Sequence, residues 1–182
     1  EGRSRRPLAS KNHGTAIAAL LAGRSDASVP GLLPKSEIVS VQAFHSSETG
    51  EDIADVFDVA SAGDTLVRRG LRVINLSFTG PNNRVLSAVV DQANGDGATL
   101  VAAAGNRGPT GPVVYPAGYE SVVAVTAVGD DLRIYRGANR GRFVDGGSTK
   151  VGADDPRVLQ HRVGRALGDR LAVVQHVDAL AD

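Results

Sequence analysis

Apolar residues are distributed along the chain in two patterns, and the first consists of short runs that are apolar almost throughout. Four such runs are rich in β-branched residues, and each is bounded by Gly, Pro or charged residues. Runs of this kind predict parallel strands that are buried on both faces of a sheet. The predicted strands span residues 38–44, 72–77, 98–104 and 121–128.

The second pattern is a helical repeat, which fills the segments between these strands. Two segments place their apolar residues on one face of a helix. These residues are Ile53, Val56, Phe57 and Ala60 in the first segment, and Val85, Leu86, Val89, Val90 and Ala93 in the second. A further helix is predicted to start near His13. The alternation predicts an α/β fold of three layers, with a mostly parallel sheet of about five strands and helices on both faces.

The two ends of the chain depart from this alternation. Residues 1–12 are polar and basic and are predicted to form an exposed N-terminal arm. In residues 146–182 arginine recurs, Phe and Tyr are absent and the strand-like runs stop. We expect this divergent tail to form one or two helices, around residues 158–167 and 171–180.

Composition excludes several classes of protein. The 20 Lys and Arg balance the 20 Asp and Glu, so we expect no nucleic acid as a partner. The chain has no Cys, which excludes disulfides and thiolate metal sites. The four histidines show no metal-ligand spacing, and no apolar run approaches the length of about 18 residues that a membrane span needs.

Two short segments carry candidate chemistry. His13-Gly14-Thr15 precedes a run of Ala and Leu that suits a tightly packed helix, and Ala102 to Asn106 ends the most apolar strand. Open α/β sheets place ligands at the carboxyl ends of their strands, where an Asn carboxamide can donate to an oxyanion. Taken singly, the first segment is more typical of a surface histidine, and Gly105-Asn106 is more typical of a simple turn.

Together and in this order, these segments resemble the subtilisin-like serine peptidases, or subtilases. This sequence has counterparts of the family's histidine motif, of its substrate strand, of the wall of its specificity pocket with the oxyanion Asn, and of the loop and strand that follow. The resemblance covers about residues 13–145 and is carried by residues 13–15, 75–80, 102–106, 115–128 and 139–145.

The resemblance implies a role for each matching residue in the hydrolysis of peptide bonds. His13 would be the general base, and Asn106 would donate to the tetrahedral intermediate. The implied substrate-binding residues are Ser77, Phe78, Thr79 and Gly80, which would pair with a peptide or protein substrate by strand addition, and Ala103, Ala104 and Gly105, which would line the specificity pocket. Family members are often secreted and often bind structural calcium, but no calcium ligand can be assigned here.

The sequence also departs from the family. Thr79 stands where subtilases usually have Gly, which would narrow the mouth of the pocket. No Asp or Glu that fits the orienting carboxylate precedes His13, and the only serines after Asn106 are Ser121 and Ser148, neither of which fits the nucleophile. We therefore expect a fragment, consistent with the absence of Met, that is inactive as given.

The resemblance stops abruptly after Asp145, where subtilases commonly continue with Ala-Ala-Pro-Gly. Codons for Gly146-Gly147-Ser148, read from their second nucleotide, permit Ala-Ala-Pro. We hypothesise a frameshift near codon 146, in the gene or in its sequencing.

Two other functions compete with this interpretation. A non-catalytic, peptide-binding remnant of the same fold would keep residues 77–80 and need neither the Asp nor the Ser. A nucleotide-binding domain is disfavoured, because Pro109 and Pro112 follow Gly105-Asn106 where a phosphate-binding helix would have to start.

Overall fold

The computed structural model describes residue 9 and residues 12–28, 30–127, 133–141, 143 and 170–174. Within these residues there are three helices and seven strands. The predicted strands and crossover helices occur in the predicted order, and three further strands, at residues 45–46, 52–53 and 170–174, were not predicted. The helices are α1 (Asn12–Ala22), α2 (Val56–Arg68) and α3 (Arg84–Gly95). The strands are β1 (Glu37–Val41), β2 (His45–Ser46), β3 (Asp52–Ile53), β4 (Val73–Leu76), β5 (Thr99–Ala103), β6 (Val122–Val125) and β7 (Arg170–Val174).

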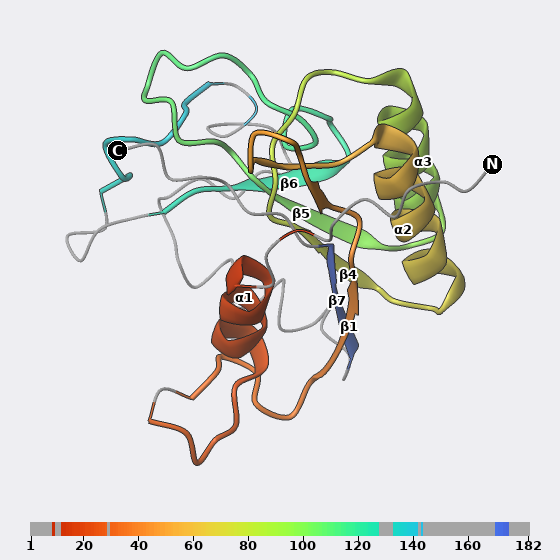
Figure 1. Cartoon of the computed structure of the whole chain (residues 1–182), viewed down its shortest axis with the longest axis vertical. Coiled ribbons are helices and arrows are strands. Elements are labelled where there is room, and N and C mark those ends of the chain that lie inside the picture. The colour runs from red at the N-terminus through yellow and green to blue at the C-terminus, as the bar shows by residue number, and fades with distance from the viewer. Residues whose placement is uncertain are drawn as a thin grey trace.

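Five of the strands form one parallel sheet, in the order β1-β7-β4-β5-β6. Helices α2 and α3 pack against each other on one face, and α1 lies on the other (Figure 1). The short strands β2 and β3 form a separate antiparallel pair. The predicted three-layer α/β fold, with a parallel sheet between helices, is confirmed.

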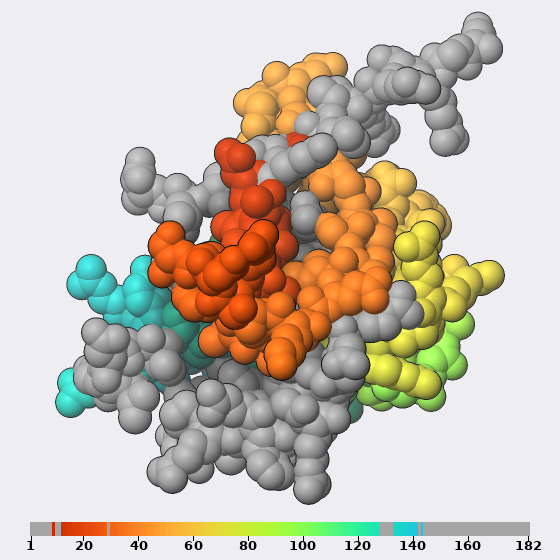
Figure 2. Space-filling view, turned by 90° about the horizontal axis from the view of Figure 1, so that it is seen from below, coloured from red at the N-terminus to blue at the C-terminus, as the bar shows by residue number. Residues whose placement is uncertain are grey.

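The core lies between the sheet and the α2–α3 layer. Leu66 of α2 and Val90 of α3 are almost fully buried against Ile74 of β4 and Val122 of β6. Helix α1, in contrast, buries only Gly14 among its residues, and Leu20 is 62% exposed. Figure 2 shows α1 and the segment that follows it at the surface of the molecule. Stability in the described residues therefore comes mainly from one face of the sheet.

The first crossover helix starts later than the apolar repeat predicts. Asp55 caps α2, since its side chain accepts the N–H of Phe57 at 2.8 Å, and Val56 is the first helical residue. Ile53, which the repeat places on the helix, lies in β3 and is 45% exposed. The capping side chain decides the start, because it satisfies a backbone donor that a longer helix would leave unpaired.

Strand β7 corrects the expected helix at residues 171–180. Residues 170–174 pair in parallel register with β1 on one side and with β4 on the other. The crossover from β1 through α2 to β4 leaves a gap of one strand, and backbone hydrogen bonds to both edges outweigh a local helical preference. The other expected helix, at residues 158–167, lies outside the described residues.

Ala9 departs from the expected exposed arm. It is 4% exposed, packs into the core and donates its N–H to the carbonyl of Phe44 at 3.4 Å. The chain is therefore already attached to the domain before α1 begins at Asn12.

Candidate active site

The parallel strands all end at the same edge of the sheet, and two of the predicted site segments leave it there. Ser77 directly follows β4, and Asn106 lies three residues beyond the end of the neighbouring β5. In an open α/β sheet this carboxyl edge is where ligands bind. The fold therefore brings the predicted substrate strand and the predicted oxyanion donor to one edge.

His13 is the second residue of α1, which packs against β1 and β7. Its side chain is half-buried, and its Nε2 is buried without a hydrogen-bond partner among the described residues. A buried nitrogen in this state costs stability, so it marks a place where a further group would be accepted. No hydrogen bond between described residues joins His13 to Ser77 or Asn106.

The predicted oxyanion segment turns from buried to exposed within three residues. Ala104 is buried and continues the sheet, since its N–H donates to the carbonyl of Val125 at 2.8 Å. Gly105 is also buried and has a φ of 99°, in the region that favours glycine. Asn106 follows and is exposed, whereas Ala103, at the end of β5, is half-buried. The backbone turn at Gly105 thus presents the Asn106 carboxamide at the edge of the sheet.

The loop after Asn106 is tied to a second segment, residues 137–139. The N–H of Gly108 donates to the carbonyl of Gly137 at 2.8 Å, and the N–H of Asn139 donates to the carbonyl of Gly105 at 3.0 Å. The Asn139 side chain is fully buried; its Oδ1 accepts the N–H of Arg107 at 2.7 Å and its Nδ2 donates to the carbonyl of Pro112 at 2.8 Å. The loop is therefore held at several backbone groups.

The predicted substrate strand is only partly open to a peptide. Phe78 is 5% exposed and packs against Phe44, with ring centroids 5.5 Å apart, so its side chain belongs to the core. Gly80 donates its N–H to Tyr115 at 2.7 Å and accepts the N–H of Tyr115 at 3.0 Å, which uses both of its backbone groups. Ser77 and Thr79 are half-buried. The N–H of Phe78 also donates, to the carbonyl of Leu76 at 2.8 Å, so only part of the backbone of residues 77–79 is available for strand addition.

Two tyrosines, Tyr115 and Tyr119, connect residues 80–83 to the loop that precedes β6. The rings of Tyr115 and Tyr119 lie 4.7 Å apart, and the Tyr119 hydroxyl both donates to the carbonyl of Asn83, at 2.8 Å, and accepts its N–H, at 3.1 Å. Burial raises the pKa of Tyr119 above its ordinary value of 10.0, and the Asn83 N–H partly opposes this rise. Asn83 also caps α3, so these contacts connect the loop to the helical layer.

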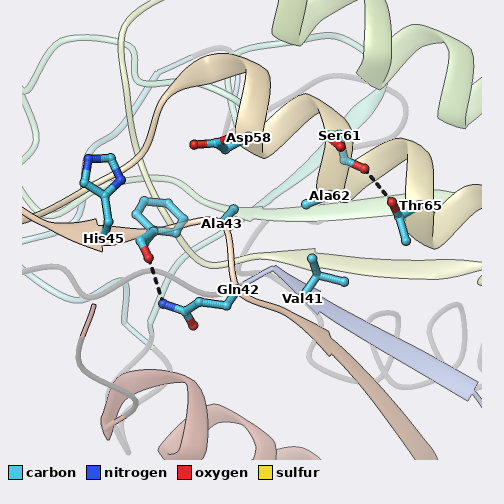
Figure 3. Close-up of a pocket in the computed structure, with 9 residues that line it drawn as sticks. Val41, Gln42, Ala43, His45, Asp58, Ser61, Ala62 and Thr65 are labelled. Atoms are coloured by element: carbon cyan, nitrogen blue, oxygen red, sulfur yellow. Dashed lines mark hydrogen bonds between the residues drawn. The ribbon is translucent and has the colours of Figure 1, made fainter. Parts of the chain in front are cut away.

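A pocket of about 350 Å³ lies between α2 and the residues that follow β1. Figure 3 shows Asp58, Ser61 and Thr65 on α2 and the segment from Val41 to His45 around it. The Thr65 hydroxyl donates to the Ser61 carbonyl at 2.8 Å, and Gln42 donates to the Phe44 carbonyl at 3.0 Å. None of its lining residues is a candidate catalytic or substrate-binding residue, so this pocket is separate from the predicted site.

Two serines follow Asn106 in the sequence. Ser121 immediately precedes β6, which places it at the amino edge of the sheet, opposite Asn106, and its hydroxyl donates to Asp91 at 3.1 Å. Ser148 lies outside the described residues. Where the structure describes the chain, no cluster of three His, Asp or Glu side chains is arranged to hold a metal ion, and no helix there has the length and hydropathy to cross a membrane.

Asn139 is the site residue whose role the sequence did not reveal. The only sequence signal is its place in Asn139-Arg140-Gly141, which matches the family's pattern without indicating a contact to the oxyanion segment 32 to 34 residues earlier. Such a contact depends on how two loops meet in space. Sequence periodicity carries no information on it.

The subtilase family's sequence profile matches residues 2–158 of this chain. Subtilisin DY of Bacillus licheniformis is 36% identical over 121 residues, which are 64% of this chain and 43% of that protein. The thermophilic serine proteinase of Bacillus sp. (strain AK1) is 35% identical over 144 residues, 76% of this chain and 34% of that protein. The minor extracellular protease Epr of Bacillus subtilis is 32% identical over 65% of this chain and 18% of its own length. The chain spans less than half the length of these relatives.

Solved structures show the same similarity. The patellamide maturation protease PatA superposes with a TM-score of 0.67 at 25% identity, over 80% of this chain and 53% of that one. The psychrophilic subtilisin-like protease Apa1 from the Antarctic psychrotroph Pseudoalteromonas sp. AS-11 gives a TM-score of 0.64 at 29% identity, over 73% of this chain and 30% of its own.

Proposed function

This chain belongs to the subtilase family, and we propose that it is the part of a serine endopeptidase domain that carries the general base and the oxyanion donor. The observation that carries the proposal is the exposed Asn106 carboxamide at the carboxyl edge of the sheet, one strand away from the segment that begins at Ser77. In the proposed complex, a donor at this edge would lie near a peptide bound along residues 77–79.

The proposed chemistry is acyl transfer from a peptide bond. His13 takes the proton of a serine hydroxyl as the hydroxyl attacks the carbonyl carbon, and returns it to the leaving amine. Asn106 donates a hydrogen bond to the oxyanion of the tetrahedral intermediate. Thr79 limits the room beside the substrate backbone, so small side chains before the scissile bond are favoured over large ones.

We propose that this polypeptide alone does not complete the reaction. No residue of the sequence fits the nucleophilic serine or the orienting carboxylate. Because the three triad groups act as a unit, loss of the serine alone lowers kcat by a factor of about 10⁶. We further propose that residues 146–182 follow a frameshift; because residues 170–174 pair with both β1 and β4, the shifted frame must still encode a strand that fits this gap. We also propose that the whole protein acts outside the cytoplasm, as the name of its relative Epr indicates for that protein.

Recovery of the flanking and alternative reading frames tests this function. A chain restored with the Asp strand and the Gly-Thr-Ser segment is expected to hydrolyse peptides, and His13→Ala to abolish that activity. Asn106→Ala should lower kcat by a factor of about 10²–10³, which is the magnitude known for removal of the oxyanion donor in a subtilisin. Asn94→Ala, at an exposed position of α3, is the matched control and should leave kcat unchanged. A restored chain that is indifferent to Asn106→Ala would refute the assigned role.

A second candidate is a non-catalytic, peptide-binding remnant. It is favoured by the half-buried backbone of Ser77 and Thr79, which can bind an extended peptide without any catalytic group. Titration of an unstructured, fluorescently labelled peptide against the purified chain separates the two. Saturable binding that Thr79→Pro abolishes supports the remnant, whereas a restored chain that cleaves the same peptide supports the endopeptidase.

A further inference from the structure

Asn139 holds the backbone on both sides of Asn106. Its own N–H donates to the carbonyl of Gly105, at 3.0 Å, and its Oδ1 accepts the N–H of Arg107, at 2.7 Å. These two groups belong to the residues immediately before and after Asn106. The backbone that determines where the Asn106 carboxamide points is therefore fixed by one residue from a different loop.

The remaining polar group of Asn139 ties down the far side of the same loop. Its Nδ2 donates to the carbonyl of Pro112 at 2.8 Å. The side chain is 0% exposed, and it is the one buried polar side chain of the described core. A carboxamide that is both buried and paired through its oxygen and its nitrogen has one stable orientation, because a flip would place donor against donor and acceptor against acceptor.

Two glycines make room for this side chain. A Cβ on Gly105 would lie 2.8 Å from Asn139 Nδ2, and a Cβ on Gly111 would lie 2.6 Å from Asn139 Oδ1. Both distances are far below ordinary van der Waals contact. The sequence of the loop thus leaves room for the buried carboxamide at two positions, Gly105 and Gly111.

We propose that Asn139 is the positioning residue of the oxyanion site, which orients Asn106 by holding Gly105 and Arg107. The inference rests on the proposed role of Asn106, but Asn139 itself contacts no reacting atom. Its effect is on preorganisation, since an oxyanion donor is effective only if it needs no reorganisation during the reaction.

The test uses the full chain and NMR, and needs no catalysis. Asn139→Ala is expected to shift the side-chain amide signals of Asn106 and to accelerate hydrogen exchange at the Arg107 N–H by about ten-fold, the equivalent of one lost hydrogen bond. Asn83→Ala is the matched control, because the Asn83 side chain accepts the N–H groups of Val85 and Leu86 in α3, so its removal lowers stability without deleting a hydrogen bond of Asn139. It should leave the Asn106 signals in place.

Asn139→Asp distinguishes positioning from general support. The carboxylate keeps the acceptor for Arg107 but lacks the donor for Pro112, whereas the protonated acid has both. The Asn106 signals of this variant should therefore return toward those of the unmodified chain as the pH is lowered and the buried acid gains its proton. Wild-type spectra at each pH provide the reference.

Three results would overturn the proposal. Asn106 signals could stay unchanged in Asn139→Ala, or shift equally in Asn83→Ala, which would indicate a global effect. If neither Asn139 variant folds, the unmodified chain still decides, because the exposed Arg107 must then show a strongly protected N–H. Unprotected exchange there excludes the hydrogen bond on which the proposal depends. Because every readout is structural, an inactive restored enzyme would refute the proposed function without altering this result.

Discussion

At the scale of single residues, Gly105 connects local backbone geometry to the site. Its φ of 99° is costly for any residue with a Cβ, and its neighbour Asn139 leaves no space for one. From the sequence, Gly105-Asn106 could be interpreted as a turn or as part of an oxyanion site. The structure shows that the chain bends at Asn106, directly after the positive φ of Gly105, and that Asn106 is exposed.

Gly105→Ala separates backbone strain from steric conflict. Gly50 also has a positive φ, of 84°, but nothing lies within 4 Å of the Cβ that it lacks. Gly50→Ala should therefore lower the free energy of unfolding by about 1–2 kcal/mol through strain alone, and Gly105→Ala by clearly more. Urea unfolding of both variants measures this difference, and equal losses would show that Asn139 does not confine Gly105.

Tyr119 gives a pH dependence with a definite sign. Burial raises its pKa in the folded chain above 10.0, so the unfolded chain loses the phenolic proton first as the pH rises. The stabilising contribution is complete below about pH 10 and is lost as the pH increases through the folded pKa.

Tyr119→Phe is expected to lower stability at neutral pH, because Asn83 loses both hydrogen bonds to the hydroxyl. It should also flatten the decline in stability above about pH 10. Urea unfolding across this pH range compares the two chains, with Tyr135→Phe as the control at an exposed tyrosine. If stability declines as steeply with pH in Tyr119→Phe as in the unmodified chain, the decline is caused by other titrating groups.

At the scale of secondary-structure elements, the sequence predicts the strands of the main sheet better than their connections. The apolar run at residues 98–104 contains β5, although burial in the strand alternates instead of covering both faces: Leu100 and Ala102 are buried, whereas Val101 is half-buried. The start of α2 could not be placed by periodicity, since Ile53 matches the helical repeat. The side chain of Asp55 overrides that match by capping the helix two residues later.

Asp55→Ala tests the importance of this cap. Loss of the hydrogen bond from the Phe57 N–H should reduce the free energy of unfolding by about 0.5–2 kcal/mol. Asp64→Ala removes an exposed carboxylate of the same helix that pairs with Arg68, and should change stability by less than about 0.5 kcal/mol. Chemical denaturation of the pair gives the comparison, and a larger loss in Asp64→Ala would contradict the capping role.

At the scale of the whole molecule, the least predictable feature is that the last described strand lies inside the sheet. Residues 170–174 contain Leu and two Val, but a short run of this kind suits a helix or a strand equally well. What decides is the gap between β1 and β4, which is a property of the assembled sheet. The hydrogen bonds of Asn139 to Gly105 and Arg107 could not be predicted from the sequence for the same reason.

Disulfide trapping tests this topology, because the chain has no cysteine of its own. Ser40 and Val173 are direct partners in the register of β1 and β7, and neighbouring strands bring Cα atoms within disulfide reach. Ser40→Cys with Val173→Cys should form an intrachain disulfide on mild oxidation, seen by non-reducing electrophoresis and mass spectrometry. Ser40→Cys with Leu171→Cys, two residues out of register, is the control and should link poorly. Equal linkage in both pairs would contradict the placement of β7.

The most direct measurement of function is an activity assay on the purified 182-residue chain, with a fluorogenic peptide substrate and a fluorophosphonate probe for an activated serine. The absence of a fitting nucleophile and orienting carboxylate predicts neither turnover nor covalent labelling. Turnover that is inhibited by the probe and abolished by His13→Ala would show instead that this chain assembles a complete catalytic site from residues to which we assign no such role.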